Sequence, residues 1–286
     1  MSAVDPPSGT RPRLHRYLKD LCLPTVRECV DAACEQAGRQ GLSYDQFLVD
    51  LLEREVEVRL QNRIERLLQE SHLPLQKSFS TFDLVRLPTR VIQQITTLRE
   101  GSFLDRRENV LAFGNPGSGK THLLCALCQE LARKGRRVLY TTCNLLVQEL
   151  LVAKRDLTLS RLLKRLGRYD ALLLDDLGYV QQTREEMEVL FTLLAERYER
   201  GSVLVTSNLP FSQWDSLFKD PMTTAAAIDR LVHHSVILEL NLPSYRMAHA
   251  SGALATTGKE PAAPVSVEVT QPSVTEGGEN ARKASL

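Results

Sequence analysis

The sequence lacks the features that mark membrane and secreted proteins. No apolar run approaches the length of about 18 residues that a membrane-spanning helix needs. Residues 1–16 contain basic residues and prolines but no apolar core of the kind found in signal peptides. We therefore expect a cytoplasmic protein without a membrane partner. The formal net charge of only +1 also excludes binding to nucleic acid through overall charge, so any such contact requires a local basic patch.

The cysteines do not form a complete metal-binding set. Cys125 and Cys128 have the spacing of a redox or zinc pair, but they lie in an apolar helical stretch. No second pair of Cys or His residues completes a zinc site. We interpret both as buried, reduced thiols and predict no metal other than magnesium.

The residue pattern divides the chain into four parts. Residues 1–13 are rich in Pro, Ser and Gly, residues 250–286 show no periodicity, and both segments are expected to be disordered. Residues 14–80 are predicted to form a small helical domain. Its long helix carries apolar side chains four residues apart from Leu48 to Leu68, and we interpret this stripe as core. Residues 81–249 are predicted to form the main domain.

The main domain alternates short apolar runs with helical segments. Mostly apolar runs without strict alternation are typical of a parallel sheet that helices cover on both faces. We therefore predict an α/β fold with strands at residues 109–113, 137–142, 171–175, 203–207 and 236–240.

One loop of this domain carries a nucleotide-binding motif. Residues 114–121 satisfy the pattern G-x-x-x-x-G-K-[ST], with a predicted strand before the motif and a helix after it. The glycines let backbone N–H groups face phosphate oxygens, and the helix N-terminus adds positive potential. We predict that ATP and Mg²⁺ bind here, with Lys120 on the β- and γ-phosphates and Thr121 on the metal. The predicted cofactor-binding residues are Gly114, Asn115, Pro116, Gly117, Ser118, Gly119, Lys120, Thr121 and His122.

Two other predicted strands end in polar residues at the edge of the sheet where this loop is expected. We predict that Asp175 holds Mg²⁺ and that Asp176 orients or deprotonates the attacking water. Asn208 can reach the γ-phosphate or the same water. Two residues also have a plain structural interpretation, with Asp176 as a helix cap and Asn208 as a turn residue. Lys120, Asp176 and Asn208 are candidate catalytic residues.

Several ordered stretches carry a family resemblance. They are residues 114–123 (GNPGSGKTHL), 172–179 (LLLDDLGY), 197–211 (RYERGSVLVTSNLPF) with Trp214, 229–233 (DRLVH) and 244–246 (SYR). On these stretches the chain resembles the AAA+ ATPases of the initiator and helicase-loader group, and most closely the IstB-like helper ATPases of bacterial insertion sequences. The resemblance implies a bacterial ATPase that assembles into a homo-oligomeric ring or helical filament. It also implies binding of double-stranded DNA, which is handed to the transposase of the same element.

The resemblance assigns roles to two residues outside the loop. Asn208 would be the sensor-1 residue, and Arg230 would be a catalytic arginine finger that acts on the nucleotide of a neighbouring subunit. The alternative for Arg230 is a surface ion pair with Asp229 or Glu239.

The chain departs from the family pattern at two places. Asn115 stands where the family usually has proline, and a position that contributes mainly backbone should tolerate the change. Residues 241–246 replace the usual Gly-Glu-Ser-Tyr-Arg ending, which leaves the role of Arg246 open. The sequence also shows no C-terminal helical lid domain.

Basic residues gather between the second predicted strand and Asp175. On one continuous helix Lys154, Arg161, Arg165 and Arg168 share a face, whereas a break at residues 156–158 removes Lys154 from it. An oligomer would repeat this face as a positive track for DNA phosphates, and the alternative is an ordinary solvated helix face. The candidate nucleic-acid-binding residues are Lys154, Arg161, Lys164, Arg165 and Arg168.

We therefore expect an ATP-dependent DNA-binding helper protein for transposition. A replicative helicase loader shares every residue of the nucleotide site and remains an alternative. A P-loop kinase would need a substrate lid and basic residues on the acceptor side, and it has no use for Asn208 with Arg230. The intact Lys120, Asp175 and Asp176 argue against a catalytically silent scaffold.

Overall fold

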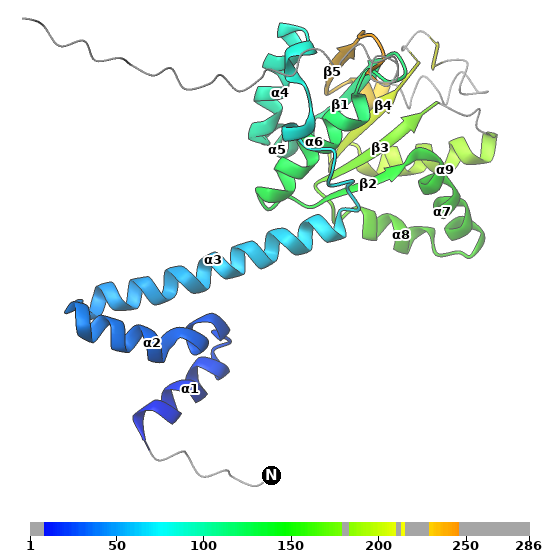
Figure 1. Cartoon of the computed structure of the whole chain (residues 1–286). Helices are drawn as coiled ribbons and strands as arrows, with labels where there is room; N and C mark the ends of the chain where they lie inside the picture. Colours follow the sequence, from blue (N-terminus) through cyan, green and yellow to red (C-terminus); the bar gives the residue numbers. More distant parts are fainter. Residues whose placement is uncertain (1–8, 179–182, 210–212, 215–228, 246–286) are drawn as a thin grey trace, which may run out of the picture.

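The N-terminal part of the protein consists of three helices. The computed structural model describes residues 9–178, 183–209, 213–214 and 229–245. The three helices are α1 (Thr10–Asp20), α2 (Pro24–Gln40) and α3 (Tyr44–Glu70). Helix α3 reaches away from the main domain and has α1 and α2 near its far end (Figure 1).

A buried carboxylate joins α2 to α3. The side chain of Glu55 on α3 accepts hydrogen bonds from the backbone N–H groups of Thr25 and Val26 at 2.9 and 3.1 Å, and from Arg59 Nε at 2.7 Å. Burial alone would raise the pKa of Glu55, but the hydrogen bonds from Arg59 and the α2 backbone lower it overall. The charged carboxylate of Glu55 therefore accepts hydrogen bonds from N–H groups at the N-terminus of α2, where the helix dipole also favours a negative charge.

The interpretation of the α3 stripe as core is wrong for its first part. Leu48, Leu52, Val56 and Leu60 are 56%, 43%, 63% and 54% exposed. Helix α2 packs instead against the neighbouring stripe of α3 that contains Leu51 and the capping carboxylate. Periodicity predicted the helix, but it could not say which stripe its partner helix would cover.

The main domain contains one five-stranded parallel sheet in the order β2-β3-β4-β1-β5. This confirms the predicted fold class. Strand β1, which leads into the nucleotide-binding loop, lies between β4 and β5, so the loop emerges from an interior strand of the sheet. The strands are β1 (Asn109–Gly114), β2 (Val138–Thr142), β3 (Ala171–Leu177), β4 (Ser202–Ser207) and β5 (Ser235–Leu240).

Helices cover both faces of the sheet (Figure 1). Alternate residues of β1 point to opposite faces: Val110 and Ala112 pack with α4 and α6, whereas Leu111 and Phe113 pack with α7, α9 and Trp214. The elements around the sheet are η1 (Phe79–Thr81), η2 (Leu84–Arg86), α4 (Thr89–Glu100), α5 (Ser102–Asp105), α6 (Lys120–Arg133), α7 (Cys143–Arg155), α8 (Leu159–Leu166) and α9 (Arg184–Arg197).

Cys125 and Cys128 lie on α6 in the core and are fully buried, and neither forms a disulfide. Burial raises the pKa of Cys125 to about 12 and that of Cys128 well above its ordinary value. Both thiols therefore remain protonated and act as small apolar side chains.

Four predictions fall partly or wholly outside the described structure. Residues 1–8 of the predicted disordered N-terminus lie outside it, whereas residues 10–13 begin helix α1, so the prediction of disorder is wrong for them. The predicted disordered tail, the predicted absence of a C-terminal lid and the role of Arg246 concern residues 246–286, which lie outside it. Within the described ranges, no helix has the length and apolar character to cross a membrane.

Candidate nucleotide site and basic groove

The loop between β1 and α6 contains glycines at positions that disfavour any side chain. Gly114 has a φ of 147°, and a Cβ built there would lie 2.1 Å from the carbonyl oxygen of Leu240 on β5. Gly117 has a φ of 79°, and its Cβ would lie 2.2 Å from Ser244 Oγ. The tight path of residues 115–119 leads directly into the N-terminus of α6, and a glycine-rich loop before a helix N-terminus is the arrangement that binds phosphate.

Two side chains in the loop fit a bound polyphosphate. Lys120 is buried at the start of α6, and its Nζ donates to the carbonyl oxygens of Gly114 and Asn115 at 2.8 and 2.9 Å. The Ser118 hydroxyl is buried, and its oxygen has no hydrogen-bond partner among the described residues. A buried hydroxyl without a partner is costly, and a phosphate oxygen would satisfy it.

Asp175 is the centre of the site, because three hydroxyl groups donate to its carboxylate. Thr121 and Thr206 donate to Oδ1 at 2.8 and 2.5 Å, and Tyr140 donates to Oδ2 at 3.0 Å. These four residues come from α6, β4, β2 and β3, so the carboxyl edge of the sheet converges on one buried carboxylate. Burial, with the charge of Asp175, raises the pKa of Tyr140, which keeps the phenol protonated as a donor.

The donor set fits magnesium. Thr121 and Asp175, the two predicted ligands, are in direct contact next to the loop that would hold the phosphates. Mg²⁺ prefers oxygen ligands and usually takes one or two from protein side chains, with phosphates and waters completing its octahedron. Sequence reasoning missed Tyr140 and Thr206. Their only signal was their position near the carboxyl ends of strands that proved to flank β3.

Asp176 occupies an irregularity of β3. Strand pairing with β4 shifts between Leu174 and Leu177, and Asp176 within this bulge has a φ of 59°. Its backbone N–H donates to Thr206 Oγ1 at 2.9 Å, and its side chain is exposed. Left-handed backbone at a residue other than glycine is strained, and such strain concentrates at functional sites.

The helix-cap interpretation of Asp176 is wrong. Thr183 caps α9, the helix that follows β3, because its Oγ1 accepts a hydrogen bond from the N–H of Glu186 at 3.3 Å. The Glu186 carboxylate in turn accepts from the Thr183 N–H at 2.6 Å, which completes a capping box. Asp176 is therefore not needed to start a helix.

Asn208 follows β4, the strand between β3 and β1, and so lies at the same edge as Asp175 and the loop. Ser207 rather than Asn208 closes the turn after β4, since its Oγ accepts from the N–H of Leu209 at 3.2 Å. Within the described ranges the Asn208 amide has no hydrogen-bond partner.

A cavity of about 60 Å³ adjoins the loop. His122 Nε2 lies 3.0 Å from the carbonyl oxygen of Ser78 and 3.1 Å from Thr81 Oγ1, so this ring contacts the connector before α4. Burial lowers the pKa of His122, which favours the neutral ring. The Arg86 guanidinium lies 5.1 Å from the ring centroid of Tyr245. The cavity is lined by Thr81, Phe82, Asp83, Arg86, Ser118, Gly119, His122, Leu242 and Tyr245.

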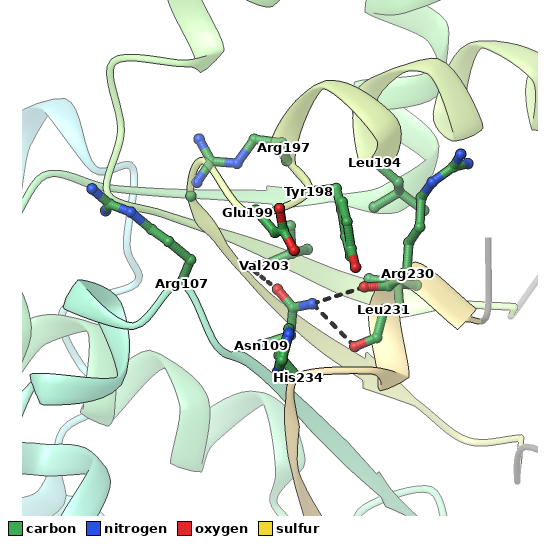
Figure 2. A pocket seen from close by; sticks show the side chains of 11 residues that line it. Arg107, Asn109, Leu194, Arg197, Tyr198, Glu199, Val203, Arg230, Leu231 and His234 are labelled. Carbon is green, nitrogen blue, oxygen red and sulfur yellow. Dashed lines mark hydrogen bonds between the residues drawn. The ribbon is translucent and has the colours of Figure 1, made fainter. Parts of the chain in front are cut away.

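Arg230 lies at the opposite, amino edge of the sheet (Figure 2). It precedes β5, whose Ser235 pairs with Asn109 and whose Leu240 pairs with Gly114. Five residue steps at about 3.3 Å each separate these edges by roughly 17 Å along the strand. The side chain of Arg230 therefore stands well away from the P-loop of its own chain.

The surroundings of Arg230 do not match the ion-pair alternative. In the described part of the chain Arg230 forms no ion pair, and its Nη1 is buried without a hydrogen-bond partner. The guanidinium lies over the ring of Phe191 on α9, with Cζ 4.8 Å from the centroid. Asn109 fixes the backbone below it, since its amide donates to the carbonyl of Leu231 at 3.0 Å and accepts from the N–H of Val203 at 2.8 Å (Figure 2).

The predicted basic face is a groove between α7 and α8. The helix breaks between Arg155 and Leu159, and Lys154 leaves the face because it pairs with Glu188 on α9 at 3.1 Å. An open groove of about 600 Å³ remains, lined by Glu149, Val152, Ala153, Thr158, Arg161, Leu162, Lys164, Arg165 and Arg168.

The cations of this groove differ in their partners. The Arg165 guanidinium pairs with Glu149 across the groove. Arg161, Lys164 and Arg168 have no ion pair among the described residues and are exposed. Three free cations in one concave surface fit a polyanion.

Comparison with known proteins decides the family. The family described as IstB-like ATP binding protein matches residues 16–253. The chain belongs to this family. An insertion-sequence ATP-binding protein of Sinorhizobium fredii is 43% identical over 248 residues, which cover 86% of this chain and 83% of that protein. The ATP-binding protein of insertion sequence IS5376 from Geobacillus stearothermophilus is 35% identical, over 82% of this chain and 94% of its own length.

Solved structures share the fold of this IstB-family chain. DnaI has a TM-score of 0.51 and 22% identity, and the match covers 60% of this chain and 96% of DnaI. Domain III of the replication initiation protein DnaA from Thermotoga maritima has a TM-score of 0.52 and 19% identity, with 64% and 74% covered. The main domain therefore has the P-loop fold of these proteins, and the chain belongs to a family of ATP-binding proteins of insertion sequences.

Proposed function

We propose that this IstB-family protein hydrolyses ATP, assembles on double-stranded DNA in its ATP-bound form and delivers that DNA to the transposase of the same insertion sequence. The observation that supports it best is the separation of Asp175 from Arg230 at opposite edges of one sheet. A site that needs both residues is complete only when a second subunit contributes its arginine. ATP binding and assembly would then be linked.

Each residue of the nucleotide site has a part in the proposed reaction. The loop N–H groups, Ser118 and Lys120 would bind the phosphates, and Thr121 and Asp175 would hold Mg²⁺, whose charge would offset that of the phosphates. Asp176 takes a proton from the attacking water. The Asn208 amide orients that water, and the neighbour's arginine stabilises the charge that develops on the transferred phosphoryl group.

Asp176→Asn separates ATP binding from hydrolysis. The change keeps the shape of the side chain and leaves Asp175 intact, but it removes the base, which contributes on the order of 10²–10⁴ in rate. We expect turnover to fall by that factor with ATP affinity nearly unchanged. Electron microscopy should then show protein–DNA assemblies that persist with ATP, whereas those of the wild-type protein disperse as ATP is consumed.

Asp105→Asn is the matched control, because Asp105 is an exposed acid that pairs with Arg136 far from the loop. It should leave turnover and assembly unchanged. Near-normal turnover in Asp176→Asn would show that Asp176 is not the base that accepts the proton of the attacking water. Assemblies of equal number without ATP or without DNA would contradict the proposed function.

The basic groove is the proposed DNA contact. Arg161→Glu combined with Arg168→Glu removes two unpaired cations, and each lost phosphate contact lowers the salt slope of binding by about 0.9. We expect much weaker binding to duplexes of any sequence and a flatter dependence on salt, measured by fluorescence anisotropy with ATP.

The control for the groove carries the same change in charge on the adjacent helix. Lys154→Glu with Arg155→Glu alters residues that already face carboxylates, Glu188 and Asp156, outside the groove. Equal losses in the two double variants would mean that bulk charge, rather than the groove, binds DNA.

A further inference from the structure

The turn between α7 and α8 carries an exposed leucine in a strained conformation. Leu157 has a φ of 57°, in the left-handed region that residues other than glycine rarely adopt. It is 93% exposed, so its side chain gains almost nothing from packing. Both the backbone and the solvent disfavour a leucine at this position.

The turn itself does not need the leucine. The N–H of Thr158 donates to the carbonyl of Ala153 at 2.8 Å, and the N–H of Leu157 donates to that of Lys154 at 3.2 Å, which is a Schellman cap. Helix α6 ends with the same pair of bonds, and there the left-handed position is Gly135. A residue that breaks this local rule without a structural gain is a candidate for a function, and at Leu157 the candidate feature is the exposed apolar side chain.

The surroundings of Leu157 are basic. Ala153 and Thr158, which the cap joins, line one end of the groove, and Arg161 follows on the first turn of α8. An apolar side chain thus projects beside a concave surface whose unpaired charges are positive. The partner that fits both features is a polyanion with an apolar interior, and stacked base pairs flanked by phosphates have that chemistry.

We propose that Leu157 is a wedge that enters duplex DNA between two adjacent base pairs while the groove holds the phosphates beside them. This inference rests on the proposed DNA-binding function and deepens it. Insertion partly unstacks the step and bends the duplex. Pyrimidine–purine steps such as TA unstack most readily, so the wedge gives a preference among target sites without hydrogen bonds to base edges.

The test measures unstacking directly. The DNA is a duplex with one central TA step whose adenine is replaced by 2-aminopurine, a base that fluoresces more strongly when it is unstacked. The full-length protein with ATP should raise this fluorescence at saturation, Leu157→Gly should abolish most of the rise, and Leu157→Phe should retain it. The melting temperature of Leu157→Gly should equal or exceed that of the wild-type protein, because glycine relieves the strained turn.

Cys22→Gly is the matched control. Cys22 has a φ of 54° at the end of α1, where the N–H of Leu23 donates to the carbonyl of Leu18 in the same type of cap. The substitution Cys22→Gly relieves the same strain far from the groove, and this variant should keep the full fluorescence rise.

Three results would overturn the wedge. If Leu157→Gly binds DNA in a salt-dependent way and gives the same fluorescence as the wild-type protein, insertion of Leu157 is excluded, whereas the proposed DNA-binding function is not. Smaller protein assemblies on the duplex with ATP for Leu157→Gly, but not for Cys22→Gly, would make Leu157 a subunit contact instead. Failure of the wild-type protein to bind the duplex with ATP would reject the proposed function together with the wedge.

Discussion

Lys120→Ala is expected to lower the affinity for ATP on the order of 10²–10⁴-fold. The lysine is predicted to contact two phosphates, and a hydrogen bond to a charged group contributes about 1.5–3 kcal/mol. The ammonium is buried and already held in position by the carbonyls of Gly114 and Asn115, so little reordering is needed when phosphate binds. A titration with a fluorescent ATP analogue measures the loss.

The control lies just beyond the other end of the same helix. Lys134→Ala removes an equal charge, and Lys134 Nζ donates only to the carbonyl of Arg99 at 2.6 Å among the described residues. Its ATP affinity should stay at the wild-type level. Circular dichroism of both variants checks that α6 is intact. Unchanged affinity in a folded Lys120→Ala protein would remove the loop from nucleotide binding.

The sequence could predict the P-loop because its signal is local. The conformation of residues 114–121 depends on glycines, on the preceding strand and on the following helix, all of which are adjacent in the chain. Asp175 was predictable for a similar reason, since an apolar strand ends there. The positions of the strands followed from runs of apolar residues, and the parallel sheet followed from the helices between them.

The hydroxyl donors around Asp175 could not be predicted in the same way. Tyr140 and Thr206 reach it only because β2 and β4 flank β3, and the order of strands is a long-range property. Threonine and tyrosine are also ordinary strand residues, so their identity carried no signal. The bulge that places Asp176 depends likewise on pairing with a strand about 30 residues away.

The basic face shows where a periodic pattern becomes ambiguous. The spacing fitted one helix as well as two, and the choice depended on residues 156–158. In the structure these residues form the cap of α7, so Lys154 turns toward α9 while Arg161 and Arg168 stay together. The helix propensity of single residues is too weak a signal to predict such a break.

Arg230→Ala is expected to reduce ATP turnover on the order of 10³–10⁵-fold while its own pocket still binds ATP. The reason is geometric. The residue lies at the amino edge of the sheet and Asp175 at the carboxyl edge, so its guanidinium can act only on a neighbour's nucleotide. Steady-state phosphate release, measured with saturating ATP and duplex DNA, gives the effect.

Arg107→Ala is the control for local damage, because Arg107 is an exposed arginine that lines the same small cavity as Arg230 (Figure 2). It removes a guanidinium from that region but leaves Asn109 and its hydrogen bonds to the backbone of residues 230–231 in place. Turnover should remain close to the wild-type rate. A comparable loss in both variants would indicate disruption of this edge rather than loss of a catalytic group.

Mixing two inactive variants tests whether Arg230 acts between subunits. Arg230→Ala keeps a working pocket and lacks the arginine, whereas Lys120→Ala keeps the arginine and lacks a working pocket. In a mixed assembly, some interfaces join the intact pocket of one variant to the intact arginine of the other. Turnover should therefore recover in part, and most at equal amounts of the two proteins. If mixtures that demonstrably assemble together on DNA recover no activity, Arg230 does not complete a neighbour's site, and the link between assembly and hydrolysis must lie in another residue.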